Sequence, residues 1–151
     1  MIRKATIKDI EKIHNLINTF AEKGLMLSRS LNSLFDSLRD FVVVTNKENE
    51  IIGCGALHIS WYNLGEVKSL AVSEKYMHKG FGKQIVNYLL DEAKELKLKK
   101  VFALTYAPEF FKKVGFNKID KSELPHKVWS DCINCPKFPD CDEIAVLINL
   151  D

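Results

Sequence analysis

Residues 67–83, with the sequence VKSLAVSEKYMHKGFGK, join an apolar run to a basic turn with paired glycines and then to an amphipathic stretch. Gly80 and Gly82 have no side chain to obstruct a ligand, so the backbone amides around them can point at an anion on the N-terminal end of the next helix. This order of elements predicts a phosphate cradle. Its basic side chains are His78, Lys79 and Lys83.

The spacing of this turn differs from two common nucleotide motifs. No GK[ST] follows the glycines, which argues against a Walker loop. The GxGxxG of a dinucleotide fingerprint is also absent, and the turn lies in mid-chain. A GxG pair alone is a weak signal, so its weight depends on the elements around it.

Hydrophobic periodicity predicts alternating helices and strands around the turn. Thr6 and Asp9 form a variant capping box before the first helix, and Gly24 ends it. The apolar face of this helix is Ile10, Ile13, Leu16, Ile17 and Phe20. Further helices are expected over 31–38, 82–96 and 108–115, and strands over 41–44, 51–61, 66–72, 101–105, from 116 and over 143–150. The apolar face of the helix over 82–96 is Ile85, Val86, Leu89, Leu90, Ala93 and Leu96. This alternation predicts an α/β (α+β) fold.

Length and composition predict one compact domain over residues 1–151. The apolar content of 46% supports a core without disulfides, and the formal charge of +2 gives no reason to expect a nucleic-acid partner. No apolar run approaches the roughly 20 residues that span a bilayer. The N-terminal sequence MIRKATIKDI lacks a secretory h-region, so we expect a cytoplasmic protein without a membrane partner.

The segments SLAV, YMHKGFGKQIVNYLL and VFALTYAPEFFKKVGF resemble the core of the GCN5-related N-acetyltransferase (GNAT) family, and the resemblance covers nearly the whole chain. It implies a mixed, mostly antiparallel sheet with a splayed strand pair flanked by helices, and acetyl-CoA as cosubstrate. By this resemblance, main-chain groups of Leu70, Ala71 and Val72 meet pantetheine. The pyrophosphate then meets the cradle residues His78, Lys79, Gly80, Phe81, Gly82 and Lys83.

Two positions depart from the family pattern. Met77 stands where the family usually has Arg or Gln, and Phe111 stands where many members have a proton-donating Tyr. Thr105 and Tyr106 are then the nearest hydroxyls by sequence that could bind the thioester or thiolate. Tyr106 could instead be a loop aromatic packed on Phe110. We interpret Phe110, Phe111 and Phe116 as core residues.

The attacking amine must lose a proton, and a carboxylate is the simplest base for that step, directly or through water. Glu66 begins the strand that leads to the cradle, and it is our candidate. The alternative is a solvated strand-end residue paired with Lys68 or Lys100.

A narrower resemblance concerns the acceptor. LSRSLNSLFDSLRDFVV, GEVKSLAV and LPHKVWSDCINCPKFPDCDEIAV resemble short, stand-alone amino-acid acetyltransferases related to N-acetylglutamate synthase, an enzyme of arginine biosynthesis. This likeness implies that Arg29 and Ser30 lie at the amino-acid pocket and that Lys127 helps to hold a carboxylate. Two separated cations suit glutamate, which has two carboxylates. Arg29 could instead be a surface residue paired with Asp36 or Asp40.

The C-terminal cysteines have two interpretations. Cys132, Cys135 and Cys141, with His126, Asp140 or Asp142, contain enough ligands for zinc, but only one CxxC is present, so a metal stays undecided. Cys54 lies in an apolar strand and is expected to be a small buried residue.

The sequence thus predicts an acetyltransferase that moves acetyl from acetyl-CoA to an amino acid, with L-glutamate as the favoured acceptor. Another amine or a protein N-terminus is the first alternative, although a polyamine would require an acidic pocket. A CoA-binding regulatory module without catalysis is the second. A homodimer is compatible with the sequence, which gives no direct information on oligomeric state.

Overall fold

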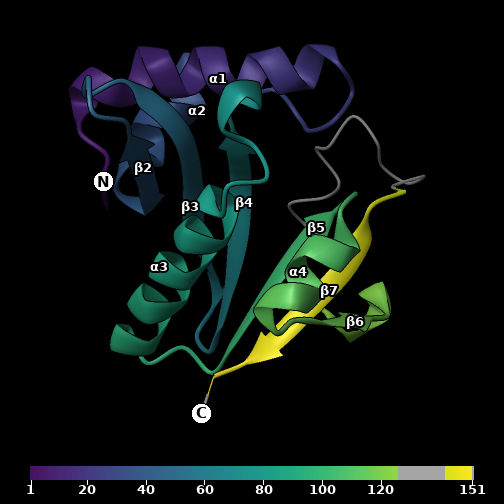
Figure 1. Cartoon of the computed structure of the whole chain (residues 1–151). Helices are drawn as coiled ribbons and strands as arrows, with labels where there is room; N and C mark the ends of the chain where they lie inside the picture. The colour runs from purple at the N-terminus through teal and green to yellow at the C-terminus, as the bar shows by residue number, and fades with distance from the viewer. Residues whose placement is uncertain (126–141, 151) are drawn as a thin grey trace. The chain divides into compact units, whose positions relative to one another are not determined.

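The structure is a computed structural model in which residues 1–125 and 142–150 are described (Figure 1). The alternation of helices and strands confirms the predicted α/β class. The elements are β1 (Ile2–Lys4), α1 (Ile10–Glu22), α2 (Leu31–Asp36), β2 (Phe41–Thr45), β3 (Ile51–Trp61), β4 (Leu64–Val72), α3 (Phe81–Glu95), β5 (Lys100–Thr105), α4 (Pro108–Val114), β6 (Asn117–Ile119) and β7 (Ile144–Asn149). The 3-10 turns are η1 (Ile7–Asp9), η2 (Leu38–Asp40), η3 (Glu74–Tyr76) and η4 (Lys121–Glu123).

The strands form one hydrogen-bonded sheet in the order β1-β2-β3-β4-β5-β7-β6. Pairing is antiparallel for β1–β2, β2–β3, β5–β7 and β6–β7 and parallel for β4–β5. The parallel register joins 64–66 to 100–102, whereas β4 continues to Val72. This topology confirms the predicted mixed, mostly antiparallel sheet.

The chain divides into two compact units, residues 1–57 with 67–91 and residues 58–66 with the described part of 92–151. In the first unit, α1 buries its predicted apolar face against alternate residues of β3, Cys54 and Ala56. Leu34 of α2 is also fully buried, whereas Leu31 and Phe35 remain about half exposed. The buried α1 residues are Ile10, Ile13, Ile17 and Phe20.

The opposite face of β3 packs against α3, and a glycine permits the close approach. A Cβ built on Gly55 would lie 2.6 Å from Cγ2 of Ile85 and 3.4 Å from Cδ1 of Leu70. A side chain at Gly55 would therefore push α3 away from the strand. Since Cys54 and Gly55 are neighbours on a strand, α1 and α3 cover opposite faces of this part of the sheet.

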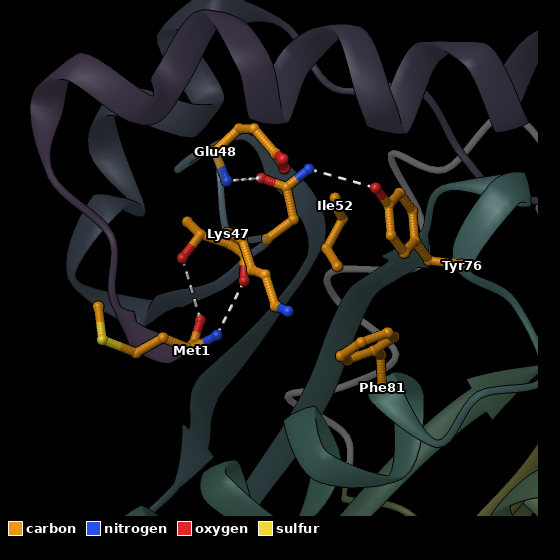
Figure 2. A pocket seen from close by; sticks show the side chains of 8 residues that line it. Met1, Lys47, Glu48, Ile52, Tyr76 and Phe81 are labelled. Carbon is orange, nitrogen blue, oxygen red and sulfur yellow. Dashed lines mark hydrogen bonds between the residues drawn. The ribbon is translucent and has the colours of Figure 1, made fainter.

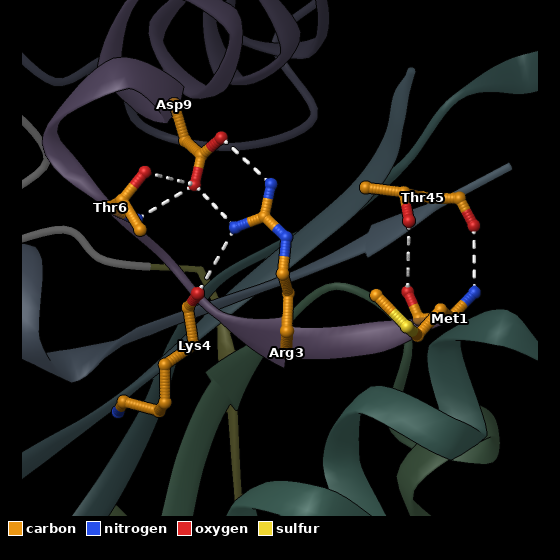
Figure 3. A network of polar contacts seen from close by, with 6 residues as sticks. All are labelled: Met1, Arg3, Lys4, Thr6, Asp9 and Thr45. Carbon is orange, nitrogen blue, oxygen red and sulfur yellow. Dashed lines mark hydrogen bonds and ion pairs between the residues drawn. The ribbon is translucent and has the colours of Figure 1, made fainter. Parts of the chain in front are cut away.

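The edge strand β1 was not predicted, because its three residues are too short for a periodic signal. Its register is Ile2 opposite Val44 and Lys4 opposite Val42. The N-terminal ammonium of Met1 donates to the Thr45 carbonyl oxygen at 2.8 Å (Figure 3). Pairing with a strand some forty residues away thus orders β1.

A polar network holds the start of α1 (Figure 3). The Asp9 carboxylate accepts hydrogen bonds from Arg3 at 2.7 and 3.1 Å and from the Thr6 backbone N–H at 2.7 Å, consistent with the predicted capping box. The Arg3 hydrogen bonds hold the pKa of Asp9 below its usual value, and burial opposes this shift only in part. The network therefore stabilises the fold through an ionised carboxylate.

The second unit has its own apolar cluster of Leu64, Phe102, Leu124 and Ala145. Phe111 and Phe116 are buried and meet edge to face at 5.1 Å, which confirms their interpretation as core residues. Gly115 ends α4 in a left-handed conformation, as predicted.

Several element boundaries differ from the sequence prediction. β4 begins at Leu64 instead of Glu66, and α3 begins at Phe81 and ends at Glu95. Leu96, predicted to be buried, lies beyond α3 and is 51% exposed. The cause is that Leu98, which is buried, closes the end of the helix by donating its N–H to the Ala93 carbonyl oxygen. Within the described residues, no helix has the length and apolar character needed to cross a membrane.

Candidate functional site

The predicted pantetheine strand uses its side chains for packing. Leu70 faces Gly55 and α3, while Ala71 is buried in the cluster with α1 on the other face. The side chains of this strand are thus engaged in packing on both faces of the sheet. Val72 then leads into a turn that the Ser73 N–H fixes by donating to the Ile52 carbonyl oxygen at 2.8 Å.

Ser69 interrupts the regular pleat of β4, since its φ of 54° is in the left-handed region. Few non-glycine residues adopt this conformation, and within a strand it bends the chain. The Cys54 thiol donates to the Ser69 carbonyl oxygen at 3.4 Å. Burial raises the pKa of Cys54 to about 12, so this thiol stays neutral, which confirms Cys54 as a small buried residue.

The predicted phosphate cradle includes an exposed loop, residues 77–80, between η3 and α3. His78 and Gly80 both have positive φ, 62° and 89°, with Lys79 between them. Left-handed residues in a turn are a feature of loops whose successive backbone N–H groups form an anion-binding concavity. The Gly80 carbonyl oxygen accepts from the Gln84 N–H at 3.1 Å, so the loop runs directly into the first turn of α3.

The other cradle residues lie beside this loop. Phe81 and Gly82 are the first residues of α3 and are partly buried, whereas Lys83 is exposed. Lys79 lies over the ring of Tyr76, with Nζ 5.7 Å from the centroid. The loop therefore presents positive charge and backbone donors on one exposed segment, which suits a pyrophosphate.

A pocket of about 550 Å³ adjoins the loop (Figure 2). Tyr76 and Phe81 form one wall, and the rest is formed by Met1, Ile52, the end of β2 at Thr45 and residues 46–48 of the β2–β3 turn. The Asn46 amide donates to the Tyr76 hydroxyl at 3.2 Å across this pocket. The β2–β3 turn and the cradle are thereby joined through side chains.

Arg29 belongs to the α1–α2 connection, and its half-buried side chain contacts α2 and β4. Its guanidinium donates to the hydroxyl oxygens of Ser33 at 2.8 Å, Ser37 at 2.9 Å and Ser69 at 3.2 Å. The group also lies 5.4 Å from the centroid of the Phe41 ring. These contacts fix the guanidinium next to Ser69, one residue before the predicted pantetheine strand.

Ser30 has a local structural role. It is the N-cap of α2, and its hydroxyl oxygen accepts from the Ser33 N–H at 3.1 Å. This cap orients the helix that supplies Ser33 and Ser37 to Arg29, so Ser30 acts on the Arg29 cluster through α2.

The predicted catalytic residues belong to the second unit, whereas the cradle loop and Arg29 belong to the first. Glu66 is half-buried on β4, opposite Phe102 of β5. At the end of β5, the Thr105 hydroxyl oxygen accepts from the Ala107 N–H at 2.8 Å, and the Tyr106 hydroxyl donates to Asp142 at 2.7 Å. Each of the two hydroxyl groups thus takes part in a hydrogen bond. The contact of Asp142 with Tyr106 was not predicted.

The remaining predicted residues lie outside the described part of the chain. They are His126, Lys127, Cys132, Cys135, Asp140 and Cys141. Among the residues that the structure describes, no three His, Cys, Asp or Glu side chains form a group able to hold a metal.

Sequence reasoning missed the serines around Arg29 and the role of Tyr76. Arg29, Ser33 and Ser37 recur every four residues, which places them on one helical face, and this signal could have been found. Ser69 and Asn46 reach their partners only through the tertiary fold, so local spacing carries no trace of those contacts.

Comparisons with known proteins identify the family of this chain. The model of the acetyltransferase (GNAT) family matches residues 7–116. An uncharacterized N-acetyltransferase of Chlorobaculum tepidum is 38% identical over 99% of this chain and 96% of its own length. An amino-acid acetyltransferase of Mycobacterium tuberculosis is 34% identical over 87% of this chain and 76% of its own.

Solved structures extend the similarity to ligand complexes. A Mycobacterium tuberculosis protein in complex with CoA has a TM-score of 0.87 and 30% identity, and the match covers 100% of this chain and 99% of that one. N-acetylglutamate synthase from Neisseria gonorrhoeae, complexed with coenzyme A and N-acetyl-glutamate, has a TM-score of 0.90 and 27% identity. This chain matches 35% of that longer protein.

Proposed function

Since the chain belongs to the GNAT family and is an acetyl-CoA-dependent N-acetyltransferase, we propose that its acceptor is the α-amino group of an amino acid, most favourably L-glutamate. The resemblance to amino-acid acetyltransferases in sequence and to N-acetylglutamate synthase in structure supports this choice. The Arg29 cluster is the observation that carries it.

The cluster provides a positively charged group in a fixed orientation. The serine hydroxyls hold the planar guanidinium beside Ser69 of β4. A guanidinium held in one orientation suits a carboxylate, because its positive charge is already in place before the ligand arrives. We assign Arg29 to one acceptor carboxylate and Lys127 to the other.

We propose that the reaction is a direct attack within a ternary complex. The acceptor nitrogen forms a bond to the acetyl carbonyl carbon, and the carbon–sulfur bond of the thioester breaks. Glu66 accepts the proton that the amine loses, directly or through water, and the CoA thiolate takes up a proton from solvent or a nearby hydroxyl. Thr105 and Tyr106 are the candidate hydroxyls, and the leaving thiolate needs only modest help because its pKa resembles that of cysteine.

For the cofactor, we propose that backbone groups of Leu70, Ala71 and Val72 bind pantetheine. The loop 77–80 and the first turn of α3 would then hold the pyrophosphate, with Lys79 and Lys83 adding charge. The alternating left-handed residues His78 and Gly80 support this assignment.

A thiol-release assay over a panel of amines tests the acceptor class. Wild-type protein, acetyl-CoA and equal concentrations of glutamate, glutamine, aspartate, lysine, spermidine and a peptide N-terminus would be compared by kcat/KM. We expect the highest value with glutamate. If kcat/KM were highest with spermidine, the proposed acceptor class would be contradicted. If kcat/KM were equal for glutamate and glutamine, the proposal of a pocket for two carboxylates would be contradicted.

A further inference from the structure

Tyr76 lies immediately before the cradle loop 77–80, and Phe81 lies immediately after it. Their rings meet edge to face, with centroids 6.1 Å apart. The contact between the two aromatic rings thus holds the two ends of the loop together. An edge-to-face pair of this kind stabilises the arrangement beyond the area that it buries.

The segment before the loop is anchored at each end to a different part of the first unit. Glu74 of η3 forms an ion pair with Lys23 at the end of α1. The Tyr76 hydroxyl accepts a hydrogen bond from the Asn46 amide (Figure 2). Because η3 is anchored and 77–80 is exposed, the conformation of the loop depends on where the anchors place its ends.

Asn46 is itself fixed within the β2–β3 turn. Its side-chain oxygen accepts the N–H groups of Glu48 at 3.0 Å and Glu50 at 2.9 Å. Because its own turn holds Asn46 in place, Asn46 fixes the position of the Tyr76 hydroxyl and ring. Lys79 in turn lies over that ring at a cation–π distance.

We propose that Tyr76 is a positioning residue for the pyrophosphate of acetyl-CoA. Its ring holds the ends of the loop together through Phe81 and orients Lys79, and its hydroxyl is held by Asn46. The inference rests on the proposed cofactor loop. A ligand that reaches this loop would benefit from a preformed conformation, since ordering the loop on binding would reduce its affinity. A ligand without phosphates would gain nothing from Tyr76.

The test compares acetyl-CoA with S-acetylpantetheine, which has the same reacting thioester and lacks the pyrophosphate. For Tyr76→Leu we expect the KM for acetyl-CoA and the Kd for CoA to rise about three- to tenfold, because an aromatic pair and a cation–π contact are lost. We expect kcat with acetyl-CoA and kcat/KM for S-acetylpantetheine to stay within about twofold of the wild type. Tyr76→Phe keeps the ring and should raise the same KM by only about two- to threefold.

Tyr62→Leu is the matched control, since Tyr62 is 83% exposed and contacts Trp61 instead of the loop. An unchanged Kd for CoA in Tyr76→Leu would overturn the inference. So would an equal loss with both acetyl donors, because that result indicates a general structural role. Gly82→Val distinguishes a failure of the Tyr76 role from a failure of the cofactor loop, because an unchanged Kd for CoA in that variant would refute the cofactor loop itself.

Discussion

The cradle loop and the Arg29 cluster are held by opposite means. Residues 77–80 are exposed, and their backbone conformation, with positive φ at His78 and Gly80, is their main feature. Arg29 is half-buried, and side-chain hydroxyls on α2, just after α2 and on β4 fix it. The difference supports the proposal that the loop binds its ligand through the backbone and that the cluster binds its ligand through one side chain.

This comparison predicts different tolerances to substitution. Side-chain changes in the loop should matter little unless they alter its backbone or block access to it. Conservative changes in a side-chain site should matter much, because geometry and charge are lost together. Variants of each kind can break or sharpen the distinction.

Glu66→Gln should have the largest effect, since it tests a side chain assigned to the chemistry itself. We expect kcat to fall by about 100- to 10,000-fold, the usual value of a general base. The Kd for acetyl-CoA, measured by calorimetry, should hardly change. Turnover within a few-fold of the wild type across the pH range would leave Glu66 as a strand-end residue without a role in catalysis.

Gly82→Val should have the next largest effect, because it places a branched side chain where the pyrophosphate must approach the backbone. A ligand at about 100 times its Kd stabilises a protein by roughly 2.7 kcal/mol. That stabilisation by acetyl-CoA, seen as a rise in melting temperature, should disappear in the variant. A full rise in a normally folded variant would show that the loop is not a backbone cradle.

Asp9→Asn tests whether stability can be changed without affecting either ligand site. Asp9 has a pKa below its usual value through Arg3, so its ionised form contributes stability above about pH 4 and loses that contribution as the pH falls through the lowered pKa. The unfolding free energy should drop by about 1.5 to 3 kcal/mol at pH 7. The difference from the wild type should shrink below about pH 4 in denaturant titrations, and a constant difference would contradict the charge-based account.

Lys79→Gln should have the smallest effect. The side chain is exposed, so its contribution to phosphate binding is reduced by solvent and should raise the Kd for CoA by up to about fivefold. Added salt should diminish the difference between variant and wild type. A loss as large as that of Gly82→Val would mean that the loop works through side chains after all.

The sequence predicted best those features that depend on local periodicity. The apolar faces of α1 and α3 and the end of α4 at Gly115 follow from spacing and from residue type. Leu96 was misplaced because its helix ends one residue earlier, and the final turn exposes it.

Features that depend on distant contacts could not be predicted. β1 exists because it pairs with β2, and the left-handed Ser69 inside β4 has no local signal. At the candidate site, Arg29 was identified by resemblance, whereas the hydroxyl of Ser69 that reaches it comes from a strand forty residues away. The same holds for the Tyr106 contact with Asp142.

The most direct test of the central claim is the ratio of kcat/KM for glutamate to that for glutamine in wild type, Arg29→Ala and Arg29→Lys. Arg39→Ala serves as the matched control, because Arg39 is exposed. A charged hydrogen bond is worth roughly 1.5 to 3 kcal/mol, so Arg29→Ala should lower kcat/KM for glutamate by about ten- to a hundredfold and leave the Kd for acetyl-CoA unchanged. The glutamate preference should collapse in Arg29→Ala, recover only in part in Arg29→Lys, and persist in the control. A preference that survives in Arg29→Ala would contradict the assignment of this side chain to the acceptor carboxylate.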